Sequence, residues 1–73
     1  MKREIAIHTD FIRLDALLKL AGVAQTGGHA KIMILEEEVL VNGAICTMRG
    51  KKCVVGDEIT VNGGQIVLIG ATK

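Results

Sequence analysis

Two stretches of the chain repeat apolar residues with the spacing of an α-helix. In the first stretch, apolar residues recur at i, i+3, i+4 and i+7, at Leu14, Leu17, Leu18 and Ala21. Thr9 or Asp10 is expected to cap this helix, and Gly22 is expected to end it. Asp15 and Lys19 stand four residues apart, so an ion pair between them is predicted on the exposed side of the helix.

A second helix is predicted to begin at Thr26, whose hydroxyl can accept a hydrogen bond from the amide of the third helical residue. It should run to about Glu36 and bury one face, formed by Ala30, Met33 and Ile34. The connection between the two helices is very short. Because helices joined so tightly cross at a sharp angle, they need a sheet behind them to complete a core.

The remaining segments have the pattern of strands. Ile5 and Ile7 alternate with polar neighbours and predict a short strand. Asn42-Gly43 is the strongest hairpin signal, because both positions of a type I′ turn require positive φ, and Asn62-Gly63 repeats it. Glycine-containing turns separate the later strands, which are expected at 39–41, 44–47, 52–55, 58–62 and 65–69.

The predicted fold class is α+β, with two short packed helices against a small, mostly antiparallel sheet of about four to five strands. Residues 1–73 are expected to form a single domain. Hydrophobic residues make up 49% of the chain, but Phe11 is its only aromatic residue, so the core must consist of aliphatic side chains and methionine. The composition is that of a globular protein and excludes a disordered chain.

The chain shows no segment typical of a membrane protein or a secreted protein. The longest stretch without charge, residues 59–72, is too short and too polar to span a bilayer. Met1-Lys2-Arg3 is followed directly by Glu4, which argues against a signal peptide. We therefore expect a cytoplasmic protein without a membrane partner.

Cys46 and Cys53 are expected to be reduced and packed as small apolar side chains, as is usual in the cytoplasm. A zinc site formed by both cysteines with His8 and His29 is the alternative. The spacing of the two cysteines is not that of a zinc knuckle, and the histidines are distant in sequence. We therefore expect no metal and no cofactor.

Three segments in a fixed order resemble the S4 (S-four) RNA-binding domain, a family named after a protein of the small ribosomal subunit. Residues 13–22 read Arg-Leu-Asp-Ala-Leu-Leu-Lys-Leu-Ala-Gly, residues 39–43 read Val-Leu-Val-Asn-Gly, and residues 55–59 read Val-Gly-Asp-Glu-Ile. Ala30-Lys31 in the second helix belongs to the same pattern. The resemblance covers about residues 12–61, and it implies a two-helix αL motif of the small stand-alone bacterial type. It also implies binding to RNA.

The start of the second helix is one candidate site for RNA phosphates. Two glycines in the first helical turn leave unpaired amides open, and these amides with the helix dipole favour an anion. By itself, this pattern fits equally well a helix that Thr26 simply caps. The resemblance favours RNA contact, and the candidate residues here are Gln25, Thr26, Gly27, Gly28, His29 and Lys31.

Further candidates lie on the first helix and on later turns. The resemblance places Arg13 on the same surface as the second helix; the alternatives are a solvated arginine or a partner for Asp10. A turn with three cations could reach phosphates, although a charged loop is usually just solvated. The complete set of these further candidate contacts is Arg13, Lys19, Asn42, Arg49, Lys51 and Lys52.

The formal net charge is only +1, so RNA binding requires that the charges be separated in space. Acids concentrate at residues 36–38 and 57–58, which leaves the cations free to form a separate basic face. If about six cations meet phosphates, log K should fall with log salt at a slope of about −5. Because aromatic platforms for unpaired bases are missing, the expected partner is structured RNA, rRNA or tRNA, recognised by shape and backbone.

Leu35 and Leu40 stand where the family often has polar residues, and with Ile32 they could form an exposed apolar patch for a protein partner or a homodimer. The other reading is that the sheet or the N-terminal strand covers them. The sequence carries no nucleophile with a nearby base and no carboxylate pair in an apolar pocket pattern. We therefore expect neither catalysis nor a small-molecule substrate.

Overall fold

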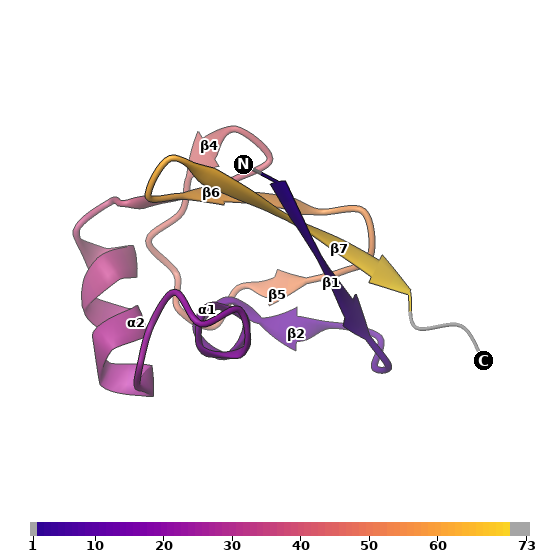
Figure 1. Ribbon diagram of the computed structural model, residues 1–73. Coiled ribbons are helices and arrows are strands. Elements are labelled where there is room, and N and C mark those ends of the chain that lie inside the picture. The colour runs from indigo at the N-terminus through magenta and orange to yellow at the C-terminus, as the bar shows by residue number, and fades with distance from the viewer. Residues whose placement is uncertain (1, 71–73) are drawn as a thin grey trace.

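The structure is a computed structural model that describes residues 2–70 (Figure 1). Of the expected domain of residues 1–73, residue 1 and residues 71–73 lie outside the described range. The elements follow one another along the chain as β1 (Lys2–Ile7), β2 (Ile12–Arg13), α1 (Leu14–Leu20), α2 (Gly27–Leu35), β3 (Val39–Val41), β4 (Ala44–Ile45), β5 (Lys52–Cys53), β6 (Glu58–Val61) and β7 (Gly64–Gly70).

The strands form one five-stranded sheet, in the order β1-β7-β6-β3-β4, and one two-stranded sheet, β2-β5. Every pair of neighbouring strands is antiparallel except β1 and β7, which run parallel. Both helices lie on one side of the larger sheet (Figure 1). The predicted α+β class is therefore confirmed.

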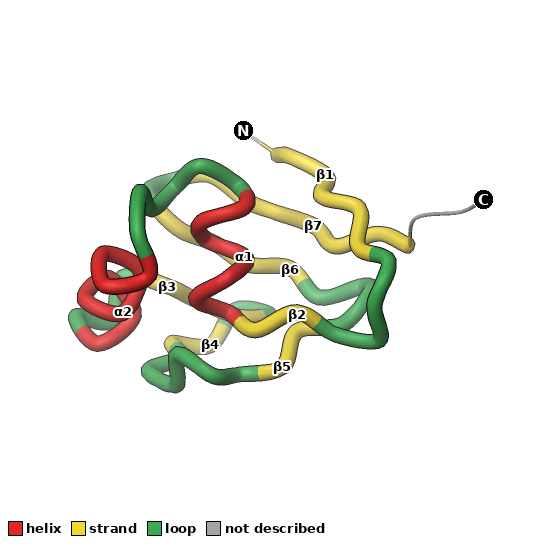
Figure 2. Tube along the Cα trace, turned by 90° about the horizontal axis from the view of Figure 1, so that it is seen from below, coloured by secondary structure: helices red, strands yellow, loops and turns green. Residues whose placement is uncertain are grey.

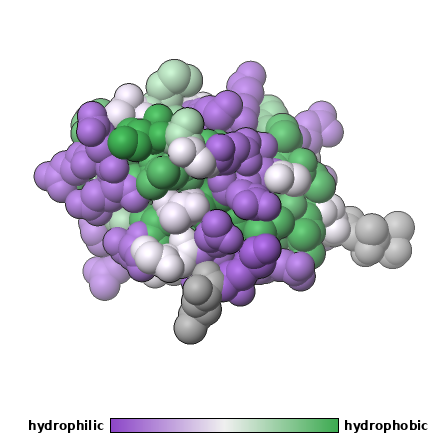
Figure 3. Space-filling model, turned by 90° about the horizontal axis from the view of Figure 1, so that it is seen from above, coloured by the Kyte–Doolittle hydropathy of each residue, from purple (hydrophilic) through white to green (hydrophobic). Residues whose placement is uncertain are grey.

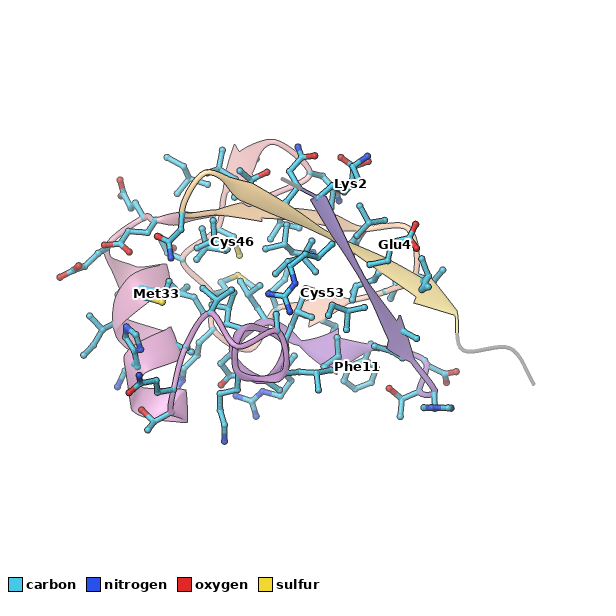
Figure 4. All side chains as sticks on the ribbon, in the orientation of Figure 1. Lys2, Glu4, Phe11, Met33, Cys46 and Cys53 are labelled. Carbon is cyan, nitrogen blue, oxygen red and sulfur yellow. The ribbon has the colours of Figure 1, made fainter. Side chains whose placement is uncertain are left out.

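The core lies between the larger sheet and the helices. Successive strand residues point to opposite faces, so one face of each strand turns towards the helices. Lys2 and Glu4 of β1 point away from the helices, whereas Met33 and Cys53 point towards the space between the layers (Figure 4). The fully buried side chains are aliphatic or sulfur-containing, and the largest are Leu14, Leu17, Leu18, Ile34, Ile59, Leu68, Val39 and Cys53.

The other face of the sheet has no layer over it among residues 2–70. In Figure 3 this face carries hydrophilic residues with apolar residues between them. Leu40 lies on it, because its strand neighbours Val39 and Val41 are buried on the opposite side. The fold thus has two layers, and its open sheet face is only partly polar.

Both predicted hairpin turns are confirmed by their backbone angles. Asn42 and Gly43 have φ values of 53° and 85°, and Asn62 and Gly63 have φ values of 54° and 78°. Positive φ at both central residues is the requirement of a type I′ turn. Asn42 additionally joins the β3-β4 turn to the start of β6, because its side-chain amide donates to Asp57 Oδ1 over 3.1 Å and its side-chain oxygen accepts from Glu58 N over 3.0 Å.

Helix α1 begins later than the sequence predicts. Neither Thr9 nor Asp10 caps it: the hydroxyl of Thr9 donates to the carbonyl of Phe11, and the residue before the helix, Arg13, makes no capping hydrogen bond with its side chain. The segment between belongs to β2, which pairs with β5. This pairing also explains why the expected strands 44–47 and 52–55 are shortened and belong to different sheets.

Helix α2 agrees with its prediction at both ends. Thr26 is the N-cap and Glu36 the C-cap, and the buried residues are Ala30, Met33 and Ile34. Beyond the helix, Glu38 N donates to Met33 O and Glu37 N to Ile34 O, the hydrogen-bond pattern of a Schellman motif. Glu37 therefore has the left-handed conformation, with φ of 63°, at a position where glycine is usually found.

Candidate nucleic-acid interface

The turn that carries three of the predicted cations is fixed to the start of α1 by backbone hydrogen bonds. Leu14 N donates to Lys51 O over 2.9 Å, and Asp15 N donates to Arg49 O over 3.1 Å. These carbonyls satisfy the amides of Leu14 and Asp15, so the turn serves as the N-terminal cap that the side chain of Arg13 does not provide. The fold therefore brings the cations of residues 49–52 next to α1.

Arg13 and Lys52 lie directly opposite each other in the β2-β5 pair. Opposite residues of an antiparallel pair project on the same face, so two positive side chains are neighbours here. Two groups moderate their repulsion: Asp15 Oδ2 lies 3.4 Å from Arg13 Nη2, and the ring centroid of Phe11 lies 4.9 Å from Lys52 Nζ. Like charges in such a pair cost a fraction of a kcal/mol in stability, and an anion bound between them would reverse that cost.

The partner of Asp15 differs from the predicted one. In the part of the chain that the structure describes, Asp15 pairs with Arg13 and forms no ion pair with Lys19. Arg13 likewise pairs with Asp15 and not with Asp10. Sequence reasoning missed the supporting roles of Phe11 and Asp15, since these depend on β2 and β5, which are two residues each and give no periodic signal.

At the start of α2, Thr26 and His29 form a reciprocal cap. His29 N donates to Thr26 Oγ1 over 3.0 Å, and Gln25 N donates to His29 Nδ1 over 3.3 Å. Because Nδ1 accepts this hydrogen bond, the neutral imidazole carries its proton on Nε2. The Nε2–H group of the exposed His29 is then available as a donor beside the first turn of the helix.

Gly27 and Gly28 occupy the first turn of α2 without a structural need for glycine. Neither residue has a positive φ. A Cβ atom added at Gly27 would meet nothing within 4 Å, and one added at Gly28 would meet only Thr26 Oγ1, at 3.8 Å. Among residues 2–70, no acceptor is bonded to the amides of Gly27 and Gly28. The absence of side chains leaves these two amides accessible to a ligand.

Viewed from below, α1 crosses the middle of the molecule, with α2 on one side and the β2-β5 pair on the other (Figure 2). The predicted contacts therefore fall into three adjoining groups: the start of α2 with Lys31, the exposed Lys19 on α1, and Arg13 with the turn that follows β4. We call this set the basic surface; it consists of Arg13, Lys19, Gln25, Thr26, Gly27, Gly28, His29, Lys31, Arg49, Lys51 and Lys52.

Asn42 is the one predicted contact that we leave out of the basic surface, because its side chain is already engaged, although Asn42 and Lys51 line one hollow of the molecular surface. It lies in the β3-β4 turn, and both ends of its side-chain amide are engaged by Asp57 and Glu58. In Figure 1 this turn lies near the top, whereas α1 and the first turn of α2 lie near the bottom. The acids at residues 36–38 follow the opposite end of α2 from the basic surface.

The cysteines are packed as expected. Cys53 is buried and Cys46 half-buried, and both thiols are free. Burial, with a smaller contribution from the charge of Asp57, raises the pKa of Cys53 from 9.0 to about 11. Residues 2–70 contain no cluster of three or more His, Cys, Asp or Glu side chains that could hold a metal ion. No helix within that range has the length and apolar character needed to cross a membrane.

Comparisons with known proteins find a matching family and relatives of similar sequence. The family model of the S4 domain matches residues 5–69. The probable ribosome maturation protein RlbA of Bacillus subtilis is 46% identical over 63 residues, which cover 86% of this chain and 89% of that protein. The putative RNA-binding protein YbcJ of Escherichia coli is 36% identical over 58 residues, covering 80% of this chain and 83% of that one.

The fold is also shared with a solved structure. The solution structure of YbcJ from Escherichia coli, described as revealing an αL motif involved in RNA binding, superposes with a TM-score of 0.64. The sequences are 32% identical in this comparison, which covers 93% of this chain and 85% of that one. The family match spans nearly all described residues, and the two helices with their sheet have the architecture of this relative. The chain belongs to the S4-domain family.

Proposed function

We propose that this protein is a non-catalytic RNA-binding protein that recognises structured RNA, rRNA or tRNA, through its basic surface. The observation that carries the proposal is the unfavourable pairing of Arg13 with Lys52 directly beside the turn of residues 49–51. A phosphate bound between the two side chains would neutralise their remaining repulsion. The names of the relatives, a ribosome maturation protein and a putative RNA-binding protein, support the same assignment.

The basic surface is suited to the backbone of a folded RNA. Its donors are flexible cations and two helix amides, which bind phosphate without reading a base. Phe11 is the only Phe, Tyr or Trp residue, and Lys52 Nζ lies 4.9 Å from its ring centroid, so the protein has no row of aromatic rings on which successive bases could stack. Recognition by shape and phosphate position follows, as is usual for helical regions of RNA.

The test compares alanine variants on and off the basic surface. Arg13→Ala, Lys31→Ala and Lys51→Ala should each weaken binding to a structured ribosomal RNA hairpin and make the slope of log K against log salt less negative by about 0.9. The control is Lys2→Ala, because Lys2 is an exposed cation on the open side of the sheet (Figure 4). Fluorescence anisotropy over a series of salt concentrations measures both quantities.

Two outcomes would contradict the proposal. If wild-type protein failed to bind the hairpin even at low salt, RNA binding through this surface would be wrong. If all four variants lost affinity equally, the attraction would be a general effect of charge. An amide-shift titration gives an independent map, with the largest shifts expected at Arg13, at residues 27–31 and at residues 49–52.

A second function is favoured by the outer face of α2. Ile32 and Leu35 are each 55% exposed, and the strands that could cover them lie elsewhere in the fold. Leu40 is not part of this patch, since it lies on the open face of the sheet. The candidate occupants of this helix face are a second copy of the chain and a protein partner. A homodimer predicts that Leu35→Ser lowers the sedimentation coefficient, and a monomeric coefficient for both wild type and variant would exclude the homodimer.

A further inference from the structure

A hollow of about 380 Å³ opens between the β3-β4 hairpin and the loop that leads to β5. Its walls include Ile45 of β4, Met48 of the loop and Lys51. The volume is within the range of about 300–1,000 Å³ typical of small-molecule sites. Lys51 belongs to the basic surface, so the hollow and that surface adjoin each other.

The hollow has an exposed apolar wall. Met48 is 62% exposed, although it stands one residue before Arg49 in a loop otherwise rich in cations, and nothing within residues 2–70 covers its side chain. Ile45 borders the hollow with its backbone, because its side chain lies on the same sheet face as that of its cross-strand partner Leu40. A methionine thioether is flexible and polarisable, so it adapts well to a flat aromatic ring.

The hollow also offers a backbone donor and acceptor. β4 is the edge strand of the five-stranded sheet, and Ile45 pairs with Leu40. The flanking Cys46 N donates to Val39 O, so by the alternation of an antiparallel ladder the N–H and C=O of Ile45 point outward, away from β3. A group that enters the hollow beside β4 therefore meets one donor and one acceptor on the open edge.

The loop is held in position by the elements around it. Lys51 N donates to Met48 O over 3.1 Å, which closes the turn, and Lys51 O accepts from Leu14 N over 2.9 Å. The backbone of Lys51 thus connects Met48, which forms the apolar wall of the hollow, to the start of α1. RNA bound on the basic surface would pass the mouth of the hollow with its backbone close to Lys51.

We propose that this hollow takes one unstacked nucleobase of the RNA that the basic surface binds. A nucleobase has flat apolar faces, which match the exposed Met48 side chain, and a hydrogen-bonding edge, which matches the open backbone edge of β4 at Ile45. The phosphate next to it would lie near Lys51. The inference rests on the proposed function, and it adds a preference for RNA in which one base is extruded from a helix, which a surface that contacts only backbone would not have.

The experiment compares two RNA hairpins with the same stem, one of which carries a single bulged nucleotide. Wild-type protein should bind the bulged hairpin about fivefold more tightly, a difference at the lower end of what one base contact contributes. Met48→Ser should remove this preference and leave affinity for the plain hairpin unchanged. The control is Val54→Ser, because Val54 is an exposed apolar residue outside the hollow.

A second readout reports the base directly. When a ring lies against the Met48 methyl group, its ring current shifts that methyl resonance upfield, and the resonance is assigned by its loss in Met48→Leu. The aromatic rings of the protein are those of Phe11, His8 and His29, and none of these residues lines the hollow, so a new upfield shift that requires the bulged nucleotide is assigned to a ring of the RNA. The plain hairpin should not produce it.

The outcomes separate the two proposals. Equal affinity for both hairpins together with an unshifted Met48 methyl resonance would overturn the nucleobase site and leave the proposed function intact. Loss of the bulge preference in Val54→Ser as well would also overturn it, because the preference would then not come from the hollow. Failure of wild-type protein to bind either hairpin would overturn the proposed function itself.

Discussion

Replacing Gly27 and Gly28 with alanine should make the protein more stable and a weaker RNA binder. Neither glycine has a positive φ, and the added methyl groups meet open space or, at 3.8 Å, Thr26 Oγ1. A glycine-to-alanine change at a compatible position stabilises by about 0.4–1 kcal/mol, so the double variant should gain about 1–2 kcal/mol. For a domain of this size, that gain corresponds to a melting temperature higher by roughly 4–16 °C.

The RNA affinity should change in the opposite direction. The amides of Gly27 and Gly28 are free to meet a phosphate, and a hydrogen bond to a charged group is worth about 1.5–3 kcal/mol. Loss of one such contact by steric blocking should weaken binding at least about tenfold. Thermal unfolding and fluorescence anisotropy on the same preparations measure the two effects.

The matched control is Gly70→Ala, which makes the same change in β7, where the new Cβ would lie 3.9 Å from Val55 Cγ2 and no positive φ is involved. Its RNA affinity should equal that of wild type. If the double variant at Gly27 and Gly28 gained stability and kept its RNA affinity, the amides would not contact RNA and Thr26 would serve only as a helix cap. If the double variant at Gly27 and Gly28 were less stable than wild type, the inference that the added methyl groups fit without a clash would be refuted.

Two further predictions concern stability. Glu37→Gly should raise the free energy of unfolding by about 1 kcal/mol, because glycine adopts the φ of 63° without strain; urea unfolding measures this, and an equal gain in Glu37→Gln would assign it to charge instead. Burial in the folded protein raises the pKa of Cys53 from 9.0 to about 11, so the thiol loses its proton at a lower pH in the unfolded chain than in the folded protein. Stability should be unaffected below pH 9 and fall by at most about 3 kcal/mol as pH rises to about 11; the same pH dependence in Cys53→Ala would contradict this.

The parts of the fold that the sequence predicts are those decided by neighbouring residues. The Thr26 cap and both Asn-Gly turns depend on interactions within four residues, and all three are confirmed. The start of α1 depends instead on carbonyls from residues 49 and 51, far along the chain. No local pattern carries that information, because β2 and β5 have two residues each.

The same distinction applies to the candidate surface. The open amides at the start of α2 could be predicted from two glycines after a capping threonine. The position of Arg13 opposite Lys52 could not be predicted, because it results from the pairing of β2 with β5, two short strands that are far apart in the sequence. Asn42 shows the opposite case: its role in the turn was predicted correctly, and the structure adds that its side chain locks the turn to Asp57 and Glu58.

The parallel pairing of β1 with β7 has a consequence for how the chain folds. The register joins Lys2 to Gln65 and Ile7 to Gly70, so the pair closes a loop that contains all the other elements. Contacts so distant in sequence form slowly, which makes the docking of β1 a late event. Until then β7 is an unprotected edge strand, the kind of edge to which strands of other molecules add. The speed with which β1 reaches this edge therefore sets how long each newly made chain is exposed to aggregation.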